Sequence, residues 1–203
     1  MDAQIYNRHF RTESLEKTAP MATINTDIHY LLDETKPYFS DHKLERFDRS
    51  QYRDLQYTHT SSDNAEVLLS MVRGTNHPDY HGLSWLELLP TNPDDYKHLQ
   101  DWERWAHEGK MKRGWKCILE MRQNPNYYLD SIGKNHWSFC KIGDFYYITQ
   151  GNHRTVMARF LLSLNGLPEV IRGVSVTEIH LPQQEHPKTP LPLLKRLTRR
   201  LSP

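Results

Sequence analysis

The sequence predicts an α/β fold. Three observations indicate this class: short segments with apolar residues at helical spacing, aromatic and β-branched runs bounded by turn residues, and a succession of the two in the second half of the chain. Hydrophobic residues make up 37% and charged residues 25% of the 203 residues, a balance typical of a chain that buries a core. This length favours one substantial domain.

The first 83 residues are predicted to form a helical extension. The segment TDIHYLLDE, residues 26–34, places its apolar residues on one helix face after a cap at Thr26 or Asp27. The segment SSDNAEVLLSMVRG, residues 61–74, predicts a second helix, with a capping Ser or Asp near its start and Gly at its end.

The middle of the chain predicts one strand and two helices. LSWLELLP, residues 83–90, alternates as a strand does. The longer segment at 92–109 has Asn92 as a cap, Pro93 at the first helical position and acids in the first turn. RGWKCILEMRQN, residues 113–124, has apolar residues at helical spacing and predicts the second helix.

The last third predicts a hairpin, a helix and a strand. HWSFCKIGDFYYITQ, residues 136–150, contains two short β-type runs separated by Gly143 and Asp144, which form a two-residue turn. The apolar period becomes helical from Asn152 and predicts a short amphipathic helix that stops at an Asn-Gly pair. EVIRGVSVTEIHL, residues 169–181, predicts the closing strand.

Several classes of protein are disfavoured by composition. The chain has no run of about 18 apolar residues, which a membrane helix needs, and its first residues lack the apolar centre of a secretory signal. We therefore expect a cytoplasmic protein. Cys117 and Cys140 are the only cysteines, too few for a metal cluster by themselves, and they predict core thiols.

The overall charge of +1 conceals an asymmetry along the chain. From Cys140 onward nine Lys and Arg accompany four Asp and Glu, which leaves +5 there and −4 in the remainder. Such a segment attracts polyanions, although a solvated basic tail would have the same composition. The candidate DNA-binding residues lie in the proline-containing basic tail, residues 182–203: Lys195, Arg196, Arg199 and Arg200.

The joint in YYITQGNHRTVMARFL carries the candidate site. Gly151 ends the strand and permits a close backbone approach, and Asn152 is a good cap whose following amides point out of the helix end. His153 and Arg154 add donors, and Thr155 adds a hydroxyl. An anion such as phosphate suits this arrangement. An ordinary capped helix start accounts for the same residues without a ligand.

This segment resembles the signature of the ParB/sulfiredoxin superfamily, in which a strand ends in Gly, a variable residue, His or Arg, and Arg before a helix with Ala and bulky apolar residues. The resemblance covers residues 84–181, between the extension at 1–83 and the tail at 182–203. It implies a ParB/sulfiredoxin-like nucleotide-binding core, built as a mixed sheet with surrounding helices. The phosphates of the bound nucleotide would rest on the helix start, with Mg²⁺. Asn152 stands where sulfiredoxins have their nucleophilic Cys and partition proteins an acidic residue, so no metal ligand is assigned.

Within the superfamily, the chain is similar in size to the plasmid fertility-inhibition branch, typified by the oncogenic suppression protein. That branch implies hydrolysis of ATP or another nucleoside triphosphate, coupled to DNA cleavage or to inhibition of conjugative DNA transfer. The predicted catalytic residues are Arg154, His153 and Glu87, with Asp94 as the alternative acid. DNA and a conjugation or partition protein are the implied macromolecular partners.

Two other functions fit the same sequence. One is a non-enzymatic interaction protein that retains the fold, and the other is a small-molecule kinase of the same superfamily. A kinase would transfer phosphate to an added hydroxyl compound instead of to water.

Other polar and aromatic residues fit both a functional and an ordinary role. Lys134 and His136 precede the hairpin and are predicted nucleotide-binding residues, with a polar loop as the alternative. His77 and His81 are four residues apart beside Pro and Gly, which favours surface histidines over a metal pair. Four tyrosines suggest base stacking or, more often for short strands, a core; they are Tyr127, Tyr128, Tyr146 and Tyr147.

Overall fold

A six-stranded mixed sheet is the centre of the structure, a computed structural model that describes residues 23–52, 58–98, 110–111 and 114–181. The strands lie in the order β1-β3-β5-β4-β6-β2. β4 pairs antiparallel with β5 and β2 antiparallel with β6, whereas the other neighbours are parallel. The strands are β1 (Glu45–Arg46), β2 (Thr58–Leu68), β3 (Val72–Thr75), β4 (Ser138–Ile142), β5 (Phe145–Gln150) and β6 (Val170–His180). The α/β class is confirmed.

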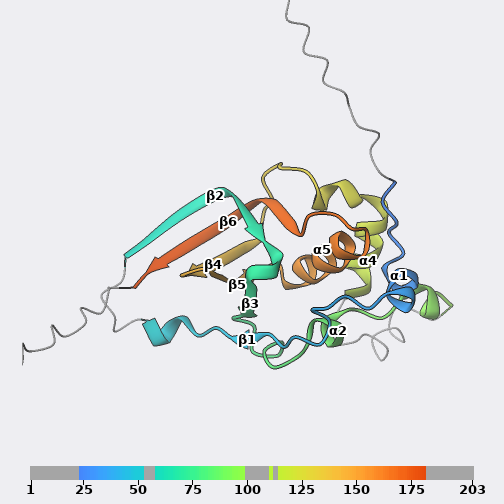
Figure 1. The fold of residues 1–203 in the computed structure, drawn as a ribbon, viewed down its shortest axis with the longest axis horizontal. Coiled ribbons are helices and arrows are strands. Elements are labelled where there is room, and N and C mark those ends of the chain that lie inside the picture. Colours follow the sequence, from blue (N-terminus) through green and yellow to red (C-terminus); the bar gives the residue numbers. More distant parts are fainter. Residues whose placement is uncertain (1–22, 53–57, 99–109, 112–113, 182–203) are drawn as a thin grey trace, which may run out of the picture.

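Helices gather at one end of this sheet, where α1, α4 and α5 lie side by side (Figure 1). The α-helices are α1 (Ile28–Glu34), α2 (Trp85–Leu88), α4 (Gly114–Gln123) and α5 (Asn152–Leu164). The 3₁₀ turns are η1 (Arg49–Tyr52), η2 (Leu69–Met71), η3 (Pro93–Tyr96) and η4 (Pro125–Tyr128). Within the described part of the chain, no helix combines the length and apolar content needed to cross a membrane.

α5 is the core helix of the molecule. Eight consecutive residues, from Thr155 to Leu162, are buried, so the helix is covered on every side. The amphipathic pattern predicted for it is therefore wrong. A helix with no exposed stripe is packed by neighbours all round, and here these include α1 and α4. Arg159, in the middle of the buried stretch, is only 2% exposed.

Most elements of the last third are confirmed. The hairpin strands β4 and β5 meet at Gly143, which has φ of 56° as a two-residue hairpin turn requires. α5 ends at Asn165 and Gly166 as predicted, and β6 occupies the predicted closing segment. Earlier in the chain, α1 and α4 lie where helical spacing places them, and the side chain of Asp27 accepts the amide of Tyr30 as a cap.

Two predicted elements are of the wrong type. Residues 61–74 form β2, η2 and β3 instead of a helix, because β2 pairs with β6 more than 100 residues later in the chain and this partner is invisible to local patterning. Residues 83–90 contain the helix α2 instead of a strand. The Ser84 side chain accepts the amide of Glu87 while the Glu87 carboxylate accepts the amide of Ser84, so a capping box starts that helix.

The predicted boundary between residues 83 and 84 does not separate a helical extension from the sheet. β1, β2 and β3 precede residue 84, yet they belong to the same sheet as the hairpin and β6. Asn92 caps η3 with Pro93 as its first residue, as predicted, but η3 is a 3₁₀ turn that ends at Tyr96. Residues 97–98 are not helical, and residues 99–109 lie outside the described part. The basic tail at 182–203 also lies outside it.

A bulge in β6 brings a loop onto the sheet. Between the pairs Ala65–Val174 and Val67–Ile171, β6 has one more residue than β2, and Gly173 lies there with φ of 73°. A Cβ at this position would collide with the main-chain carbonyl of Ile132. The bulge therefore requires glycine for its conformation and for the close approach of the loop.

Gly173→Ala should lower the free energy of unfolding by at least about 2 kcal/mol, since left-handed strain of about 1–2 kcal/mol is joined by a backbone clash. Gly166→Ala is the matched control. Its φ is 64°, but no atom lies within 4 Å of the added Cβ, so only the strain applies. Urea denaturation of both variants measures the difference, and equal losses would contradict the described approach of Ile132.

Candidate functional site

The start of α5 depends on the packing of Trp137 over Gly151. Gly151 has φ of 83° and is the cap residue, so the prediction that Asn152 is the cap is wrong: Asn152 is the first helical residue. A Cβ on Gly151 would lie 2.7 Å from Cδ1 of Trp137. Glycine is thus required here by an indole ring of the protein itself. The first hydrogen bond of the helix runs from Thr155 to Gly151, so the amides before it point out of the helix end.

A hollow of about 410 Å³ opens in front of this helix start. We call it the α5 hollow. It is lined by His77, Tyr80, Cys117, Glu120, His136, Gly151, Asn152, His153 and Arg154. Its lining thus includes the four consecutive residues Gly151 to Arg154 and the predicted residue His136, which come from separate segments of the chain. His136 has a positive φ of 56°, an uncommon conformation for a residue with a side chain.

Asn152 is held by a buried threonine of the neighbouring strand β3. The hydroxyl of Thr75 donates to Oδ1 of Asn152 at 2.7 Å, and it accepts the amide of His77. Thr75 is fully buried, so this link is shielded from water. Because the oxygen of Asn152 is occupied, its amide nitrogen is the end of the side chain that can donate to a ligand.

Two histidines and a tyrosine form a connected group on one wall of the hollow. The ring of His77 stacks on Tyr80 with 3.8 Å between centroids, and the Tyr80 hydroxyl lies 3.4 Å from Nε2 of His153. Nδ1 of His77 accepts the amide of Asp79, so a neutral His77 carries its proton on Nε2. Burial raises the pKa of Tyr80, which keeps its hydroxyl protonated at neutral pH. His77 is therefore part of the hollow, whereas His81 is exposed.

Arg154 stands between the α5 hollow and a second one. Its Nη1 donates to the carbonyl of Asn135 at 2.9 Å, and its guanidinium lies 5.7 Å from the centre of the Tyr127 ring. A guanidinium has five N–H donors in one plane, so this anchor orients the group without using most of them. The side chain is only half-buried.

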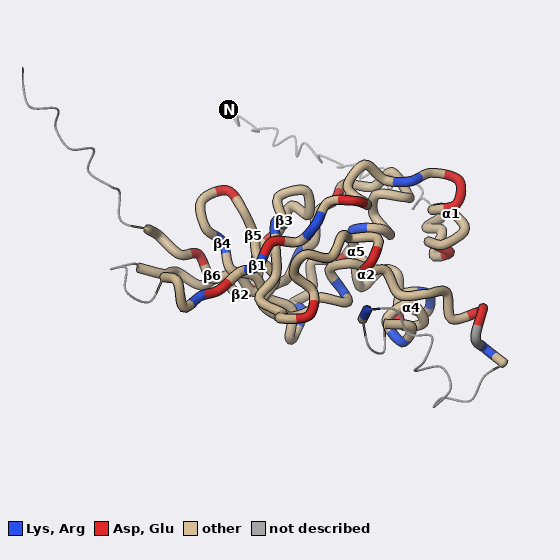
Figure 2. Tube along the Cα trace, turned by 90° about the horizontal axis from the view of Figure 1, so that it is seen from below, with Lys and Arg blue, Asp and Glu red and all other residues tan. Residues whose placement is uncertain are grey.

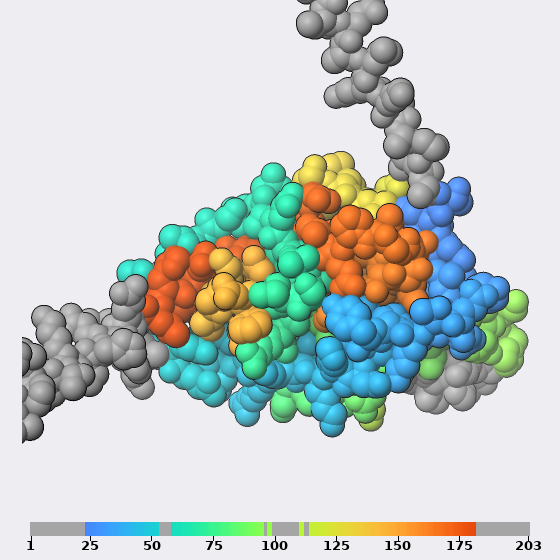
Figure 3. Space-filling view, viewed as in Figure 1, coloured from blue at the N-terminus to red at the C-terminus, as the bar shows by residue number. Residues whose placement is uncertain are grey.

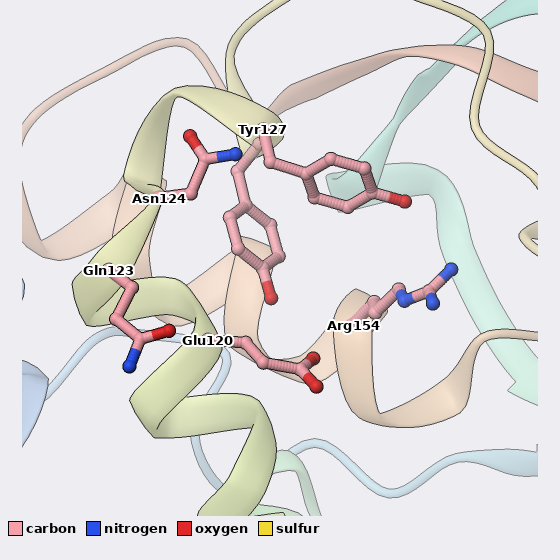
Figure 4. Close-up of a pocket in the computed structure, with 6 residues that line it drawn as sticks. Glu120, Gln123, Asn124, Tyr127 and Arg154 are labelled. Atoms are coloured by element: carbon pink, nitrogen blue, oxygen red, sulfur yellow. The ribbon is translucent and has the colours of Figure 1, made fainter.

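The second hollow, of about 310 Å³, lies beyond Arg154. We call it the tyrosine hollow. Its lining residues are Glu120, Gln123, Asn124, Tyr127, Tyr128 and Arg154. The two hollows share Glu120 and Arg154, so they adjoin. Figure 4 shows the Glu120 carboxylate and the Arg154 guanidinium facing the same space beside Tyr127.

The tyrosines divide into two groups. Tyr127 is half-buried and stacks on Trp137 with an interplanar angle of 20°, so one of its faces is already covered. Tyr128 is buried, and burial raises its pKa. Tyr146 and Tyr147 lie in β5 and pack on Phe139 and Phe47 respectively, and they line neither hollow. They are partly buried residues that pack against the core.

Glu120 is the acidic residue that sequence reasoning missed. It belongs to α4, where its spacing marks it only as an exposed helix position. The fold brings it opposite Arg154, although the two are 34 residues apart in the sequence. Cys117, one turn earlier on α4, lines the α5 hollow too. Burial raises the pKa of Cys117 to about 11, so the thiol stays protonated at neutral pH and is a poor nucleophile.

Lys134, a predicted nucleotide-binding residue, has other partners. It is buried, and its Nζ contacts four oxygens: the carbonyls of Asp130, Ile132 and Arg172, and the Asp130 carboxylate. Because its ammonium group is enclosed by these oxygens, its predicted role in binding a triphosphate is replaced by a structural one.

The side chains of Thr155 and Glu87, two further predicted site residues, also form hydrogen bonds within the protein. The Thr155 hydroxyl donates to the carbonyl of Gly151 and accepts the indole N–H of Trp137, both at 2.9 Å, and the residue is fully buried. Glu87 lies in the capping box of α2 and lines neither hollow. Hydrogen bonds from Ser84 lower the pKa of Glu87, which weakens it as a base. Asp94 pairs with Arg122 at 2.7 Å.

The remaining candidates are basic residues and possible metal ligands outside the hollows. The predicted DNA-binding residues Lys195, Arg196, Arg199 and Arg200 lie outside the described part. Along the described trace, positive and negative residues are interspersed (Figure 2). Among the residues described, no group of three or more His, Cys, Asp and Glu is arranged to hold a metal ion.

Comparison of the chain with protein-family models, with curated proteins and with solved structures finds no match in any of the three. The ParB/sulfiredoxin resemblance of the segment around Gly151 therefore stays a prediction. The geometry of the two hollows is the basis on which a function is inferred.

Lys134→Met should lower the free energy of unfolding by about 3 kcal/mol, because four oxygens lose a buried cationic partner. Asp130→Asn should cost less, since the Asp130 side chain is 33% exposed and the other oxygens remain in place. Thermal and urea denaturation measure both. An unchanged stability of Lys134→Met would show that its ammonium group does not hold the loop.

Proposed function

We propose that this protein binds a nucleoside triphosphate, with ATP as the first candidate, across the two adjoining hollows at the start of α5. The observation that carries the proposal is the position of Arg154 between an open helix N-terminus and a tyrosine-lined hollow. Each hollow falls in the range of roughly 300–1,000 Å³ that is usual for small-molecule sites.

The phosphates are assigned to the α5 hollow. The helix N-terminus offers amides and the positive end of its dipole, and the residues around it add side-chain donors. Arg154 contributes planar N–H groups that match two phosphate oxygens, and Asn152 contributes its amide. His136 and His153 line the same hollow and add charge when protonated.

The base is assigned to the tyrosine hollow. Tyr127 and the amide-bearing residues Gln123 and Asn124 form its wall. An aromatic ring beside hydrogen-bonding side chains suits a purine, which has a flat face and a polar edge. Since Arg154 lines both hollows, a ligand with its anionic part in one and its flat part in the other would contact it in the middle.

The residues present fit a magnesium ion carried by the nucleotide. Mg²⁺ keeps several waters and is held by one or two carboxylates together with phosphate oxygens. Glu120 is the carboxylate that lines both hollows, so it is the residue that would hold the ion. When bound, the ion would neutralise phosphate charge. No larger protein cage is required for this kind of site.

Hydrolysis is the proposed reaction. A water oxygen would form a bond to the γ-phosphorus, the bond from that phosphorus to the β–γ bridging oxygen would break, and the proton of the water would pass to a phosphate oxygen. Arg154 and the helix end would stabilise the charge on the transferred group and on the leaving diphosphate. Coupling of this reaction to DNA cleavage or to inhibition of conjugative transfer follows only from the family resemblance and is part of the proposal on that ground.

One observation favours binding without catalysis. The contacts of Trp137 account for both Gly151 and Thr155, so one residue of the signature and one further predicted nucleotide-binding residue serve the fold itself. An interaction protein that binds a nucleotide as a structural ligand would keep the same contacts. Measured turnover separates the two functions.

Arg154→Ala should weaken ATP binding by about 10- to 100-fold, the effect of losing charge-assisted hydrogen bonds worth roughly 1.5–3 kcal/mol. Calorimetric titration in the presence of Mg²⁺ measures the dissociation constant. Arg46→Ala is the matched control, because Arg46 is exposed on β1 and lines neither hollow. Absence of ATP binding by the wild type, or equal affinity of both variants, would refute the site.

Glu120→Gln should reduce the Mg²⁺ dependence of ATP binding and the rate of phosphate release, while leaving the helix position intact. Glu34→Gln serves as control, since Glu34 ends α1 and lines neither hollow. Phosphate release by purified protein is followed together with plasmid cleavage. Release that is equal in wild type and Arg154→Ala would assign the activity to a contaminant or to another site.

A further inference from the structure

A separate cleft of about 190 Å³ lies beside the middle of α5. We call it the Arg159 cleft. Among the described residues, it shares none with either hollow of the proposed nucleotide site. Its walls come from the segment before β1, from η2 and β3, from α2, from the hairpin and from α5. Figure 3 shows segments of these colours, blue, teal and orange, meeting on one face of the molecule.

Arg159 is the buried cation of this cleft. Its guanidinium lies between two aromatic rings, 4.2 Å from the centre of Phe39 and 4.3 Å from that of Trp85. The side chain is 3% exposed, and its Nε has no hydrogen-bond partner in the described structure. Glu169 forms a buried ion pair with it, with Oε2 3.6 Å from Nε, a separation longer than a hydrogen bond, and the Tyr38 side chain also interacts with the guanidinium. Desolvation lowers the pKa of Arg159, yet an arginine stays charged inside a protein.

Two further cations line the same cleft. Lys43 lies on the surface at its rim, and Arg73 pairs with Glu45 at 2.7 Å while its guanidinium lies over Phe145. Among the described residues that line the cleft, no carboxylate is present. Three positive groups therefore line one small space, and two of them already face an acid outside the lining: Arg73 faces Glu45 and Arg159 faces Glu169. Such a concentration attracts an anion.

The other lining residues and the volume of the cleft indicate the size and chemistry of the anion. Trp85 and Phe145 are aromatic, and Ser70 adds a hydroxyl from an exposed position of η2. The volume is below the roughly 300 Å³ at which drug-sized sites begin, so the ligand is small. An anionic head beside an apolar body of a few atoms matches a cleft with cations on one side and rings on the other.

We infer that the Arg159 cleft binds a small organic anion, a carboxylate or a phosphate monoester with a compact apolar body. The head group would lie among Arg159, Lys43 and the Ser70 hydroxyl, and the apolar body against Trp85 and Phe145. This inference does not depend on the proposed nucleotide site.

The test uses benzoate and phenyl phosphate as probes and benzyl alcohol as the uncharged control of similar shape. Amide chemical shifts of the full-length chain are followed by NMR during titration up to about 10 mM, a range that detects millimolar dissociation constants. Saturable changes confined to residues 42–43, 70–73 and 145 are expected for one or both anions. The anion that binds more tightly identifies the head group.

Variants distinguish binding in this cleft from general attraction to surface charge. Lys43→Gln should weaken the bound anion about tenfold, as expected for loss of a charged hydrogen bond. Lys36→Gln should bind as the wild type does, because Lys36 is an exposed lysine paired with Asp41 outside the cleft. Lys43 is chosen because substitution of Arg159 would disturb the core.

The inference is overturned by any of three results. The first is no saturable shift with either anion, and the second is equal binding of benzyl alcohol. The third is an equal loss of affinity in Lys43→Gln and Lys36→Gln, which would indicate that surface charge alone attracts the anion.

Discussion

The ammonium group of Lys134 holds together the loop on which the candidate site depends. Four oxygens from three separate residues surround it, and one of them, the carbonyl of Arg172, belongs to the sheet. A buried cation is stable only when such partners are in place. The loop is therefore fixed to β6 before it reaches Asn135, His136 and Trp137, each of which contributes to the start of α5.

The loop that Lys134 anchors also fixes the orientation of the Arg154 guanidinium. One donor is attached to the loop at Asn135, and the aromatic ring of Tyr127 lies to one side. A flexible arginine loses rotamer entropy when it binds an anion, and an anchored one has lost part of it already. The same logic applies to Asn152, whose oxygen is fixed by Thr75. Both residues are oriented by the fold in the absence of any ligand.

Local sequence patterns predicted the elements whose signals are contained within themselves. α5 and the hairpin were recognisable because apolar period, Gly143 and the Asn-Gly stop all lie inside the segments concerned. β2 was not, because its side chains are mostly exposed and its pairing partner follows a hundred residues later. α2 could have been recognised from Ser84 and Glu87, since a Ser-x-x-Glu spacing is a known helix start.

The candidate site was predictable in part for the same reason. Gly151 to Arg154 form one contiguous run, whereas Glu120 and His77 reach the hollow only through tertiary packing. Lys134 was misassigned because charge and loop position in the sequence do not reveal that the ammonium group is buried among main-chain oxygens. A cation near a site is equally compatible with binding a ligand and with holding the protein together, and burial decides between them.

The position of β2 at one edge of the sheet bears on aggregation, because an edge strand can pair with a strand of another molecule. The 11 residues of β2, with mostly exposed polar side chains, run along the margin of the sheet, where free backbone groups could template another chain. Two register shifts, around Ser62 and Ala65 and again before Val67, interrupt its regular spacing. An irregular, hydrophilic margin offers poor geometry for fibril growth, and the shift between Ser62 and Ala65, whose extra residue lies in β2, disfavours self-templated aggregation.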